Sequence, residues 1–178
     1  MQRGELIFRL PNPDDLDAFY AMRNDAEALR PLGGYSPGMS RKAAAEWLEA
    51  RATPSRDLIF MMLHQGSGDV IGHVGLYQLD HRVRSGEFAI LIGNRGYWGR
   101  GLGETATRFM VEYGFAQLNL HRIQLEVLTS NARAIGLYVK VGFQHEGTRR
   151  AVQFKDGQYH DYHMMSLLEG EYRGFNEG

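Results

Sequence analysis

The stretch from Gly86 to Glu104, GEFAILIGNRGYWGRGLGE, decides how the rest of the chain can fold. It begins with a short apolar run, Phe88 to Ile92, which is typical of a buried β-strand. A turn rich in glycine follows, and from Leu102 onward apolar residues recur every three or four positions, as they do along a helix. The predicted unit is therefore a strand, a glycine turn and the N-terminus of a helix.

The glycine turn, Gly93 to Gly103, predicts a site for an anion. Glycine lets backbone N–H groups point outward and lets a ligand approach closely, while a helix N-terminus adds unpaired N–H groups and a partial positive charge. Gly99, Gly101 and Gly103 alternate with other residues just before a strongly helical pattern, which favours a phosphate. The alternative is a tight connection whose glycines only supply positive φ angles.

The composition of the 178 residues is that of an ordinary globular protein. Apolar residues make up 43% and charged residues 23%, which suits a substantial core. A formal net charge of −1 gives no global attraction for nucleic acid or an acidic membrane. With no cysteine, the chain forms no disulfide and offers no thiolate to a metal. No apolar run suits a signal peptide or a membrane span, so we expect a soluble, cytoplasmic protein.

Apolar patterns on both sides of the central unit predict a single mixed α/β domain over residues 1–178. Its first part, 1–56, reads as a short strand followed by helices. An antiparallel meander, one βαβ unit and a C-terminal hairpin follow, with helices on both faces of the sheet. The predicted strands after the first cover 58–64, 70–79, 88–92, 122–128, 143–154 and 159–168. The strand after the central helix should lie parallel to the central strand. We expect 169–178 to be a polar tail.

The start of the central helix also matches a dinucleotide-binding fingerprint, G-x-G-x-x-G/A, over Gly101 to Ala106. That fingerprint should follow its strand almost at once within a doubly wound sheet. Here several residues separate it from Ile92, and an antiparallel meander precedes the strand. A nicotinamide cofactor is therefore the less favoured alternative.

Further motifs follow the glycine turn in a recognisable order. GRGLGE at 99–104 is followed by LEV at 125–127, Asn131, LY at 137–138 and GF at 142–143. Together they closely resemble the GNAT superfamily of N-acetyltransferases, with a similarity that covers most of the chain from Val70 onward. LNLHRI at 118–123 and DGQYHD at 156–161 are similar to the branch that holds the ribosomal-protein N-terminal (RimJ/RimL-type) and spermidine acetyltransferases.

The resemblance implies that acetyl-CoA is the co-substrate and that the core 86–142 binds it. The N–H groups of the glycine turn should hold its pyrophosphate, although Trp98 stands where the family has Gln or Arg. If the two parallel strands splay apart, the pantetheine arm should pair with the end of the second strand. Asn131 resembles the asparagine that touches this arm, and it also suits a helix N-cap. The expected cofactor-binding residues are Arg95, Trp98, Gly99, Arg100, Gly101, Leu102, Gly103, Glu104, Val127, Leu128, Asn131 and Arg133.

The resemblance also implies which side chains move protons. Tyr138 is expected to protonate the departing CoA thiolate, and a core tyrosine is the alternative. A protonated amine must lose a proton before it attacks a thioester, which calls for a base. We rank Glu126 slightly ahead of Glu87 for this role, and a chain of waters without a single base stays open. Either glutamate could instead face solvent.

The acceptor should be a primary amine bound between two loops, and the helical N-terminal part, 1–56, is expected to shape its site. Tyr35, in the loop 31–38, and Tyr159 and Asp161, at the hairpin tip 155–161, are the expected contacts. We favour a protein N-terminus, such as that of a ribosomal protein, over a polyamine or another small amine. An acyl-CoA-binding regulatory domain without catalysis is the alternative of another class. The histidines show no metal-ligand spacing, so no metal is expected. The resemblance leaves a homodimer open.

Overall fold

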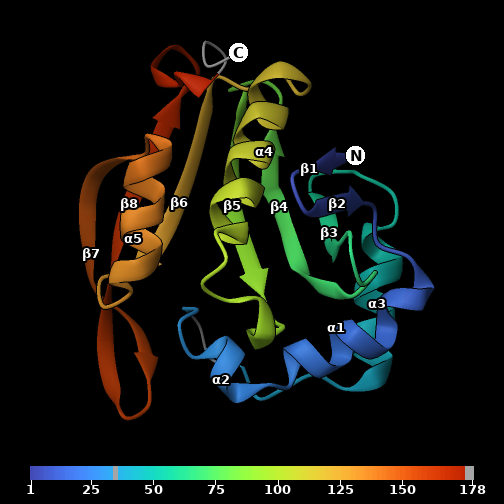
Figure 1. Cartoon of the computed structure of the whole chain (residues 1–178). Coiled ribbons are helices and arrows are strands. Elements are labelled where there is room, and N and C mark those ends of the chain that lie inside the picture. The colour runs from blue at the N-terminus through green and yellow to red at the C-terminus, as the bar shows by residue number, and fades with distance from the viewer. Residues whose placement is uncertain (34–35, 175–178) are drawn as a thin grey trace.

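An eight-stranded sheet runs through the molecule in the order β1-β2-β3-β4-β5-β6-β8-β7 (Figure 1). The computed structural model describes residues 1–33 and 36–174. All neighbouring strands are antiparallel except β5 and β6, which are parallel. The strands are β1 (Gln2–Arg3), β2 (Leu6–Arg9), β3 (Leu58–His64), β4 (Val70–Asp80), β5 (Ser85–Ile92), β6 (Arg122–Leu128), β7 (Gln144–Lys155) and β8 (Gln158–Leu168).

Helices cover both faces of this sheet. One main cluster of buried side chains joins the sheet to α4 and α5, and a smaller cluster joins it to α1 and α3. The helices are α1 (Leu16–Arg23), α2 (Ala26–Leu29), α3 (Arg41–Arg51), α4 (Leu102–Ala116) and α5 (Ala132–Val141), with 3₁₀ turns η1 (Pro13–Asp15), η2 (Arg95–Tyr97) and η3 (Glu169–Glu171). The predicted class, a mixed α/β domain with an antiparallel meander, one βαβ unit and a C-terminal hairpin, is confirmed.

Stacked aromatic rings occupy the centre of the main cluster. The rings of Phe8 and Phe109 lie parallel with their centroids 3.8 Å apart, and the edge of Phe60 meets the ring of Phe109 at 5.8 Å. Large buried rings of this kind contribute strongly to core stability because they remove much apolar area from water. They fix α4, and with it the glycine turn, against the sheet.

The parallel pair β5 and β6 separates soon after it forms. Only three residue pairs join the two strands: Ser85 with Arg122, Gly86 with Ile123 and Glu87 with Gln124. Beyond these pairs, the second half of β5 pairs with β4 alone, while β6 continues to pair with β8. The strands therefore part at the centre of the sheet, as the resemblance implied.

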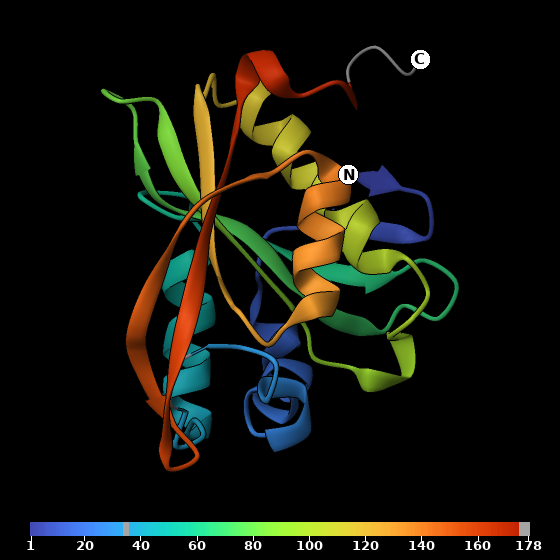
Figure 2. The ribbon, with the colours of Figure 1, turned by 90° about the vertical axis from the view of Figure 1, so that its left-hand side faces the viewer.

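The hairpin of β7 and β8 extends past the sheet toward the end of the molecule that holds α2 (Figures 1 and 2). The Lys155 ammonium at its tip donates to the carbonyls of Leu29, Arg30 and Leu32 at 3.4, 3.0 and 3.1 Å. These three carbonyls lie at the end of α2 and in the segment after it. The hairpin is thereby tied to the segment that follows α2.

The prediction of a polar tail over 169–178 is wrong for its first residues. Glu169–Glu171 form η3, and Tyr172 is buried against Phe115 with ring centroids 5.9 Å apart. The Tyr172 hydroxyl donates to Glu112 of α4 at 2.8 Å. The sequence around Tyr172 is polar and gives no sign of this packing, because the partners of Tyr172 lie some sixty positions earlier in the chain.

Candidate active site

The glycine turn connects the end of β5 to the start of α4. The indole N–H of Trp98 donates to the carbonyl of Ile92 at 2.7 Å, which anchors the turn on the strand it leaves. Gly101 has a φ of 77° and is the N-cap of α4, and no side chain caps the helix. A residue with a Cβ is strained at that φ. The first N–H groups of α4 consequently point outward without a side-chain acceptor, which is the arrangement that binds phosphate groups.

A pocket of about 530 Å³, called here the glycine-turn pocket, lies between the second half of β5, the N-terminus of α4, and α5. Leu32, which follows α2, closes part of it. The pocket brings together most of the predicted cofactor residues, which come from two separate segments. These are Trp98, Gly99, Gly101, Leu102, Gly103, Glu104, Asn131 and Arg133, with Tyr138 beside them.

Four predicted cofactor residues do not line this pocket. Arg95 forms an ion pair with Asp25 at 3.0 Å, and the guanidinium of Arg100 lies 4.9 Å from the ring centroid of Tyr97. Val127 and Leu128 are buried in β6.

Glu104 is an unexpected neighbour for an anion, because its carboxylate lies in the first turn of α4. Lys140 donates to it at 2.6 Å and Arg108 at 3.1 Å, and these hydrogen bonds lower the pKa of Glu104. The two cations offset the negative charge of the carboxylate. The wall of the glycine-turn pocket therefore stays compatible with a bound phosphate.

Tyr138 lies on α5 with its ring edge against Phe88 of β5, at a centroid distance of 5.9 Å. Only 8% of the residue is exposed, and burial raises the pKa of its hydroxyl to about 12. The hydroxyl forms no hydrogen bond with any residue in the described part of the chain. It is therefore a protonated donor at the wall of the glycine-turn pocket.

Asn131 uses both ends of its amide. The side-chain oxygen accepts from the N–H of Ala134 at 3.1 Å and so caps α5, while the side-chain nitrogen donates to the carbonyl of Pro31 at 3.0 Å. The helix-cap interpretation is confirmed. The same side chain also lines the glycine-turn pocket and ties it to the segment after α2.

Glu87 and Glu126 have different surroundings. Glu87 is half-buried and accepts a hydrogen bond from the amide of Gln78 at 3.1 Å. Burial, and then the negative charge of Glu126, raise the pKa of Glu87. Glu126 is more exposed and pairs with Arg149 at 2.5 Å. Because side chains alternate along a strand, Glu87 lies on the opposite face of β5 from Phe88, on the side covered by α1 and α3.

A second pocket of about 570 Å³, called here the α2 pocket, lies between α2, the segment after it and the hairpin tip. Both predicted acceptor walls contribute to it, through Leu32 and Gly33 on one side and Lys155 and Asp156 on the other. Leu32 lines both pockets, so the two adjoin.

The individual acceptor residues fare differently. Tyr159 is 69% exposed and packs on Phe154. Asp161 accepts from the N–H of Ala151 at 2.7 Å within the hairpin. Tyr35 lies outside the described residues. Arg23 and Lys155, which do line the α2 pocket, were not singled out from the sequence. Neither carries a local signal, because a basic residue at a helix end or in a turn is ordinary.

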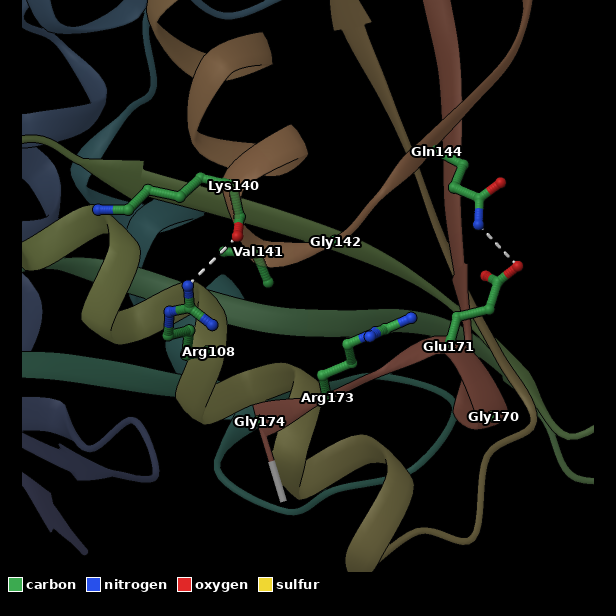
Figure 3. A pocket seen from close by; sticks show the side chains of 9 residues that line it. All are labelled: Arg108, Lys140, Val141, Gly142, Gln144, Gly170, Glu171, Arg173 and Gly174. Carbon is green, nitrogen blue, oxygen red and sulfur yellow. Dashed lines mark hydrogen bonds between the residues drawn. The ribbon is translucent and has the colours of Figure 1, made fainter. Parts of the chain in front are cut away.

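A third pocket of about 530 Å³ lies at the other end of α5, around Gly142 (Figure 3). Arg108 donates to the carbonyl of Lys140 at 3.2 Å, and Gln144 donates to Glu171 at 2.8 Å. These polar groups are occupied with each other. Among residues 1–33 and 36–174 there is no group of three potential metal ligands, and no helix in that part is both long and apolar enough to cross a membrane.

Comparison with known proteins places this geometry in a family. Residues 5–144 match the family model of the acetyltransferase (GNAT) domain. The chain belongs to the GNAT acetyltransferase family. It is 36% identical over 105 residues to the spermidine N(1)-acetyltransferase of Escherichia coli K12, across 59% of this chain and 56% of that protein. It is 35% identical over 104 residues to the L-amino acid N-acetyltransferase AaaT of the same organism, across 57% and 64%.

The structural similarity extends further than the sequence matches. A solved structure of spermidine N-acetyltransferase from Vibrio cholerae, in complex with CoA and spermine, superposes with a TM-score of 0.87 at 27% identity, over 94% of this chain and 98% of that one. Another structure of the Vibrio protein is dodecameric. The sequence matches span 56 to 64% of the length of the first curated relatives. The predicted superfamily and fold are thus confirmed.

Proposed function

We propose that this chain is an acetyl-CoA-dependent N-acetyltransferase whose acceptor is a primary amine on a small molecule. The observation that carries the proposal is the glycine-turn pocket, which runs from an uncapped helix N-terminus to the hydroxyl of Tyr138. Gly99 and Gly101 leave open space there, since a Cβ at either position would meet no atom within 4 Å. The residues present therefore fit a pyrophosphate at one end and a thioester at the other.

The two faces of the split sheet supply the two proton transfers. Acetyl-CoA supplies an acetyl thioester, and the amine nitrogen forms a bond to its carbonyl carbon as the carbon–sulfur bond breaks. Glu87 accepts the proton that the amine loses on one face of β5. Tyr138 donates a proton to the sulfur on the other face, which suits a hydroxyl whose pKa is about 12. No bond to the enzyme forms.

The sequence ranked Glu126 ahead of Glu87 as the base, but the surroundings of the two side chains favour Glu87. The carboxylate of Glu126 is already engaged by the guanidinium of Arg149 at 2.5 Å and would have to give up that ion pair to reach an amine. A half-buried carboxylate with a raised pKa is the better match to the task. We therefore place Glu87 ahead of Glu126.

The comparisons support a small-molecule acceptor better than the protein N-terminus favoured from the sequence. One relative is named for spermidine and another for amino acids, and the related Vibrio structure contains spermine. A polyamine is therefore one candidate acceptor, and an amino acid is another. The dodecameric Vibrio protein also leads us to expect self-association of this chain.

The test is turnover in a Tyr138→Phe variant. We expect kcat for a panel of primary amines to fall about 10²-fold or more, with acetyl-CoA affinity unchanged, because only the proton donor is lost. Tyr113→Phe is the matched control, since Tyr113 is a partly buried tyrosine of the same core, packed on Phe60 and Phe109. Unchanged turnover in Tyr138→Phe would remove this residue from the mechanism. Binding of acetyl-CoA without transfer to any amine would instead favour a regulatory domain.

A further inference from the structure

Arg23, the last residue of α1, is a cation without a counter-charge. Its Nε is buried and has no hydrogen-bond partner, and no carboxylate pairs with its guanidinium within residues 1–33 and 36–174. Burial lowers the pKa of Arg23, as expected for a cation that has lost water and gained no anion. A charged group in this state is costly unless something pairs with it.

Other arginines around α1, α2 and α3 are neutralised. The Nε of Arg51 is also buried without a partner, but its guanidinium pairs with Asp57 at 3.4 Å and stacks on the ring of Trp47 at 4.5 Å. Arg30, which lines the same pocket as Arg23, pairs with Glu27 at 2.5 Å. Arg23 differs from both in having no carboxylate partner.

That position is on the acceptor side of the reaction centre. Arg23 lines the α2 pocket, which adjoins the glycine-turn pocket at Leu32. It also faces β4, where its charge helps to hold down the pKa of His73. Tyr77, four residues after His73 in β4, lies directly opposite Glu87 in the β4–β5 register. The charges of Arg23 and Glu87 shift the pKa of the Tyr77 hydroxyl in opposite directions, so both groups lie near that hydroxyl.

We propose that Arg23 binds a carboxylate of the acceptor, so that the preferred substrate is an amine that carries a carboxylate near its amino group. A guanidinium matches a carboxylate with two parallel hydrogen bonds, and such charge-assisted bonds are strong where water is excluded. A polyamine would place a second positive charge near Arg23 and be repelled. The acids of the α2 pocket offer little compensation, since Glu27 is already paired and Asp156 is exposed at the hairpin tip.

The inference rests on the proposed function and narrows it to one class of acceptor. It is tested with matched acceptors, the common α-amino acids and their primary amides, together with spermidine. The amide keeps the shape of the acid and removes the charge. Its amine is also less basic, so more of it is already deprotonated, which biases the comparison against the acid. We expect kcat/KM of the unmodified protein to be about tenfold or more higher for the best acid than for its amide.

Variants of Arg23 locate the source of that preference. Arg23→Gln should lower kcat/KM for the acid by about 10- to 100-fold, mainly through KM, and leave the amide within about twofold. Arg23→Lys should retain part of the preference because it keeps the charge. Arg41→Gln is the control, since Arg41 is an exposed arginine on α3 that pairs with Asp17 and lines neither pocket. Its kinetics should match those of the unmodified protein.

The possible results separate the two proposals. Transfer to spermidine or to amides in preference to acids, or an equal loss on acid and amide in Arg23→Gln, would overturn the role of Arg23 and leave the acetyltransferase proposal intact. Transfer to no amine at all, with acetyl-CoA still bound, would overturn both. The melting temperature of Arg23→Gln should equal or exceed that of the unmodified protein, because a partly buried, unpaired cation is removed, and its acetyl-CoA affinity should be unchanged because Arg23 does not line the glycine-turn pocket. If this variant does not fold, the acid-to-amide ratio in Arg23→Lys decides the question.

Discussion

His73, a buried histidine of β4, should make the stability of the fold sensitive to acid. His73 of β4 packs beside the stacked rings of Phe19 and Trp47, with ring centroids 5.9 and 5.2 Å away. It is 7% exposed, and neither ring nitrogen has a hydrogen-bond partner in the described residues. Burial, with the charges of Arg23 and Arg51, lowers the pKa of His73 from 6.5 to about 3.

The direction of the effect follows from the two pKa values. Below pH 6.5 the unfolded chain takes up a proton at this histidine, while the folded protein does not until about pH 3. The part of the folding stability that depends on neutral His73 is therefore fully present above pH 6.5 and is lost as the pH falls toward 3. At about 1.36 kcal/mol per pH unit, the loss between pH 8 and pH 4.5 is about 2.7 kcal/mol. For a chain of this size that corresponds to roughly 5–11 °C in melting temperature.

The assay compares the unmodified protein with His73→Leu by thermal unfolding from pH 8 to pH 4.5. Both proteins lose stability as carboxylates protonate, so the difference between them isolates the histidine. We expect the melting temperature of His73→Leu to be equal or higher at pH 8, and its fall with acid to be smaller by about 5–11 °C. Parallel curves for the two proteins would refute the assignment of a buried neutral histidine.

Three further predictions concern the site. Burial raises the pKa of Glu87 above 4.5, so the fall of kcat/KM in acid should begin above that pH. This fall should disappear in Glu87→Gln and persist in Glu126→Gln, whereas the opposite pattern would make Glu126 the base. Trp98→Phe removes the indole bond to the end of β5 and should weaken acetyl-CoA binding about 2- to 10-fold in a calorimetric titration, whereas equal affinity would show that the bond is dispensable. A Cβ on Gly93 would lie 2.4 Å from Met22, so Gly93→Ala should lower stability by about 1–3 kcal/mol in urea unfolding, and an unchanged midpoint would contradict this packing.

Local patterns in the sequence were sufficient where the chemistry depends on neighbouring residues. The glycine turn is contiguous with the strand and helix that create it, and Asn131 is recognisable as a cap because its partner, Ala134, is three residues away. The strands at 58–64 and 122–128 agree with β3 and β6 because each is a buried or alternating apolar run with clear boundaries.

Features that depend on distant partners were not predictable in this way. The choice between Glu87 and Glu126 depends on Arg149, which reaches Glu126 from a strand 23 residues later. The bonds of Lys155 to the segment after α2 join residues more than 120 positions apart. The isolation of Arg23 is a property of three packed elements, and a basic residue at a helix end gives no sign of it.

The central claim, that the glycine turn binds acetyl-CoA, is tested most directly by an acetyl-CoA titration of two matched variants. Gly101 and Gly68 share a φ of 77°, and a Cβ on either would meet no atom within 4 Å, but only Gly101 lines the glycine-turn pocket. Alanine at either position should cost about 1 kcal/mol of stability through the same backbone strain. We expect Gly101→Ala to weaken acetyl-CoA binding by about tenfold or more and Gly68→Ala to bind it as the unmodified protein does. Equal affinities in the two variants would contradict the account.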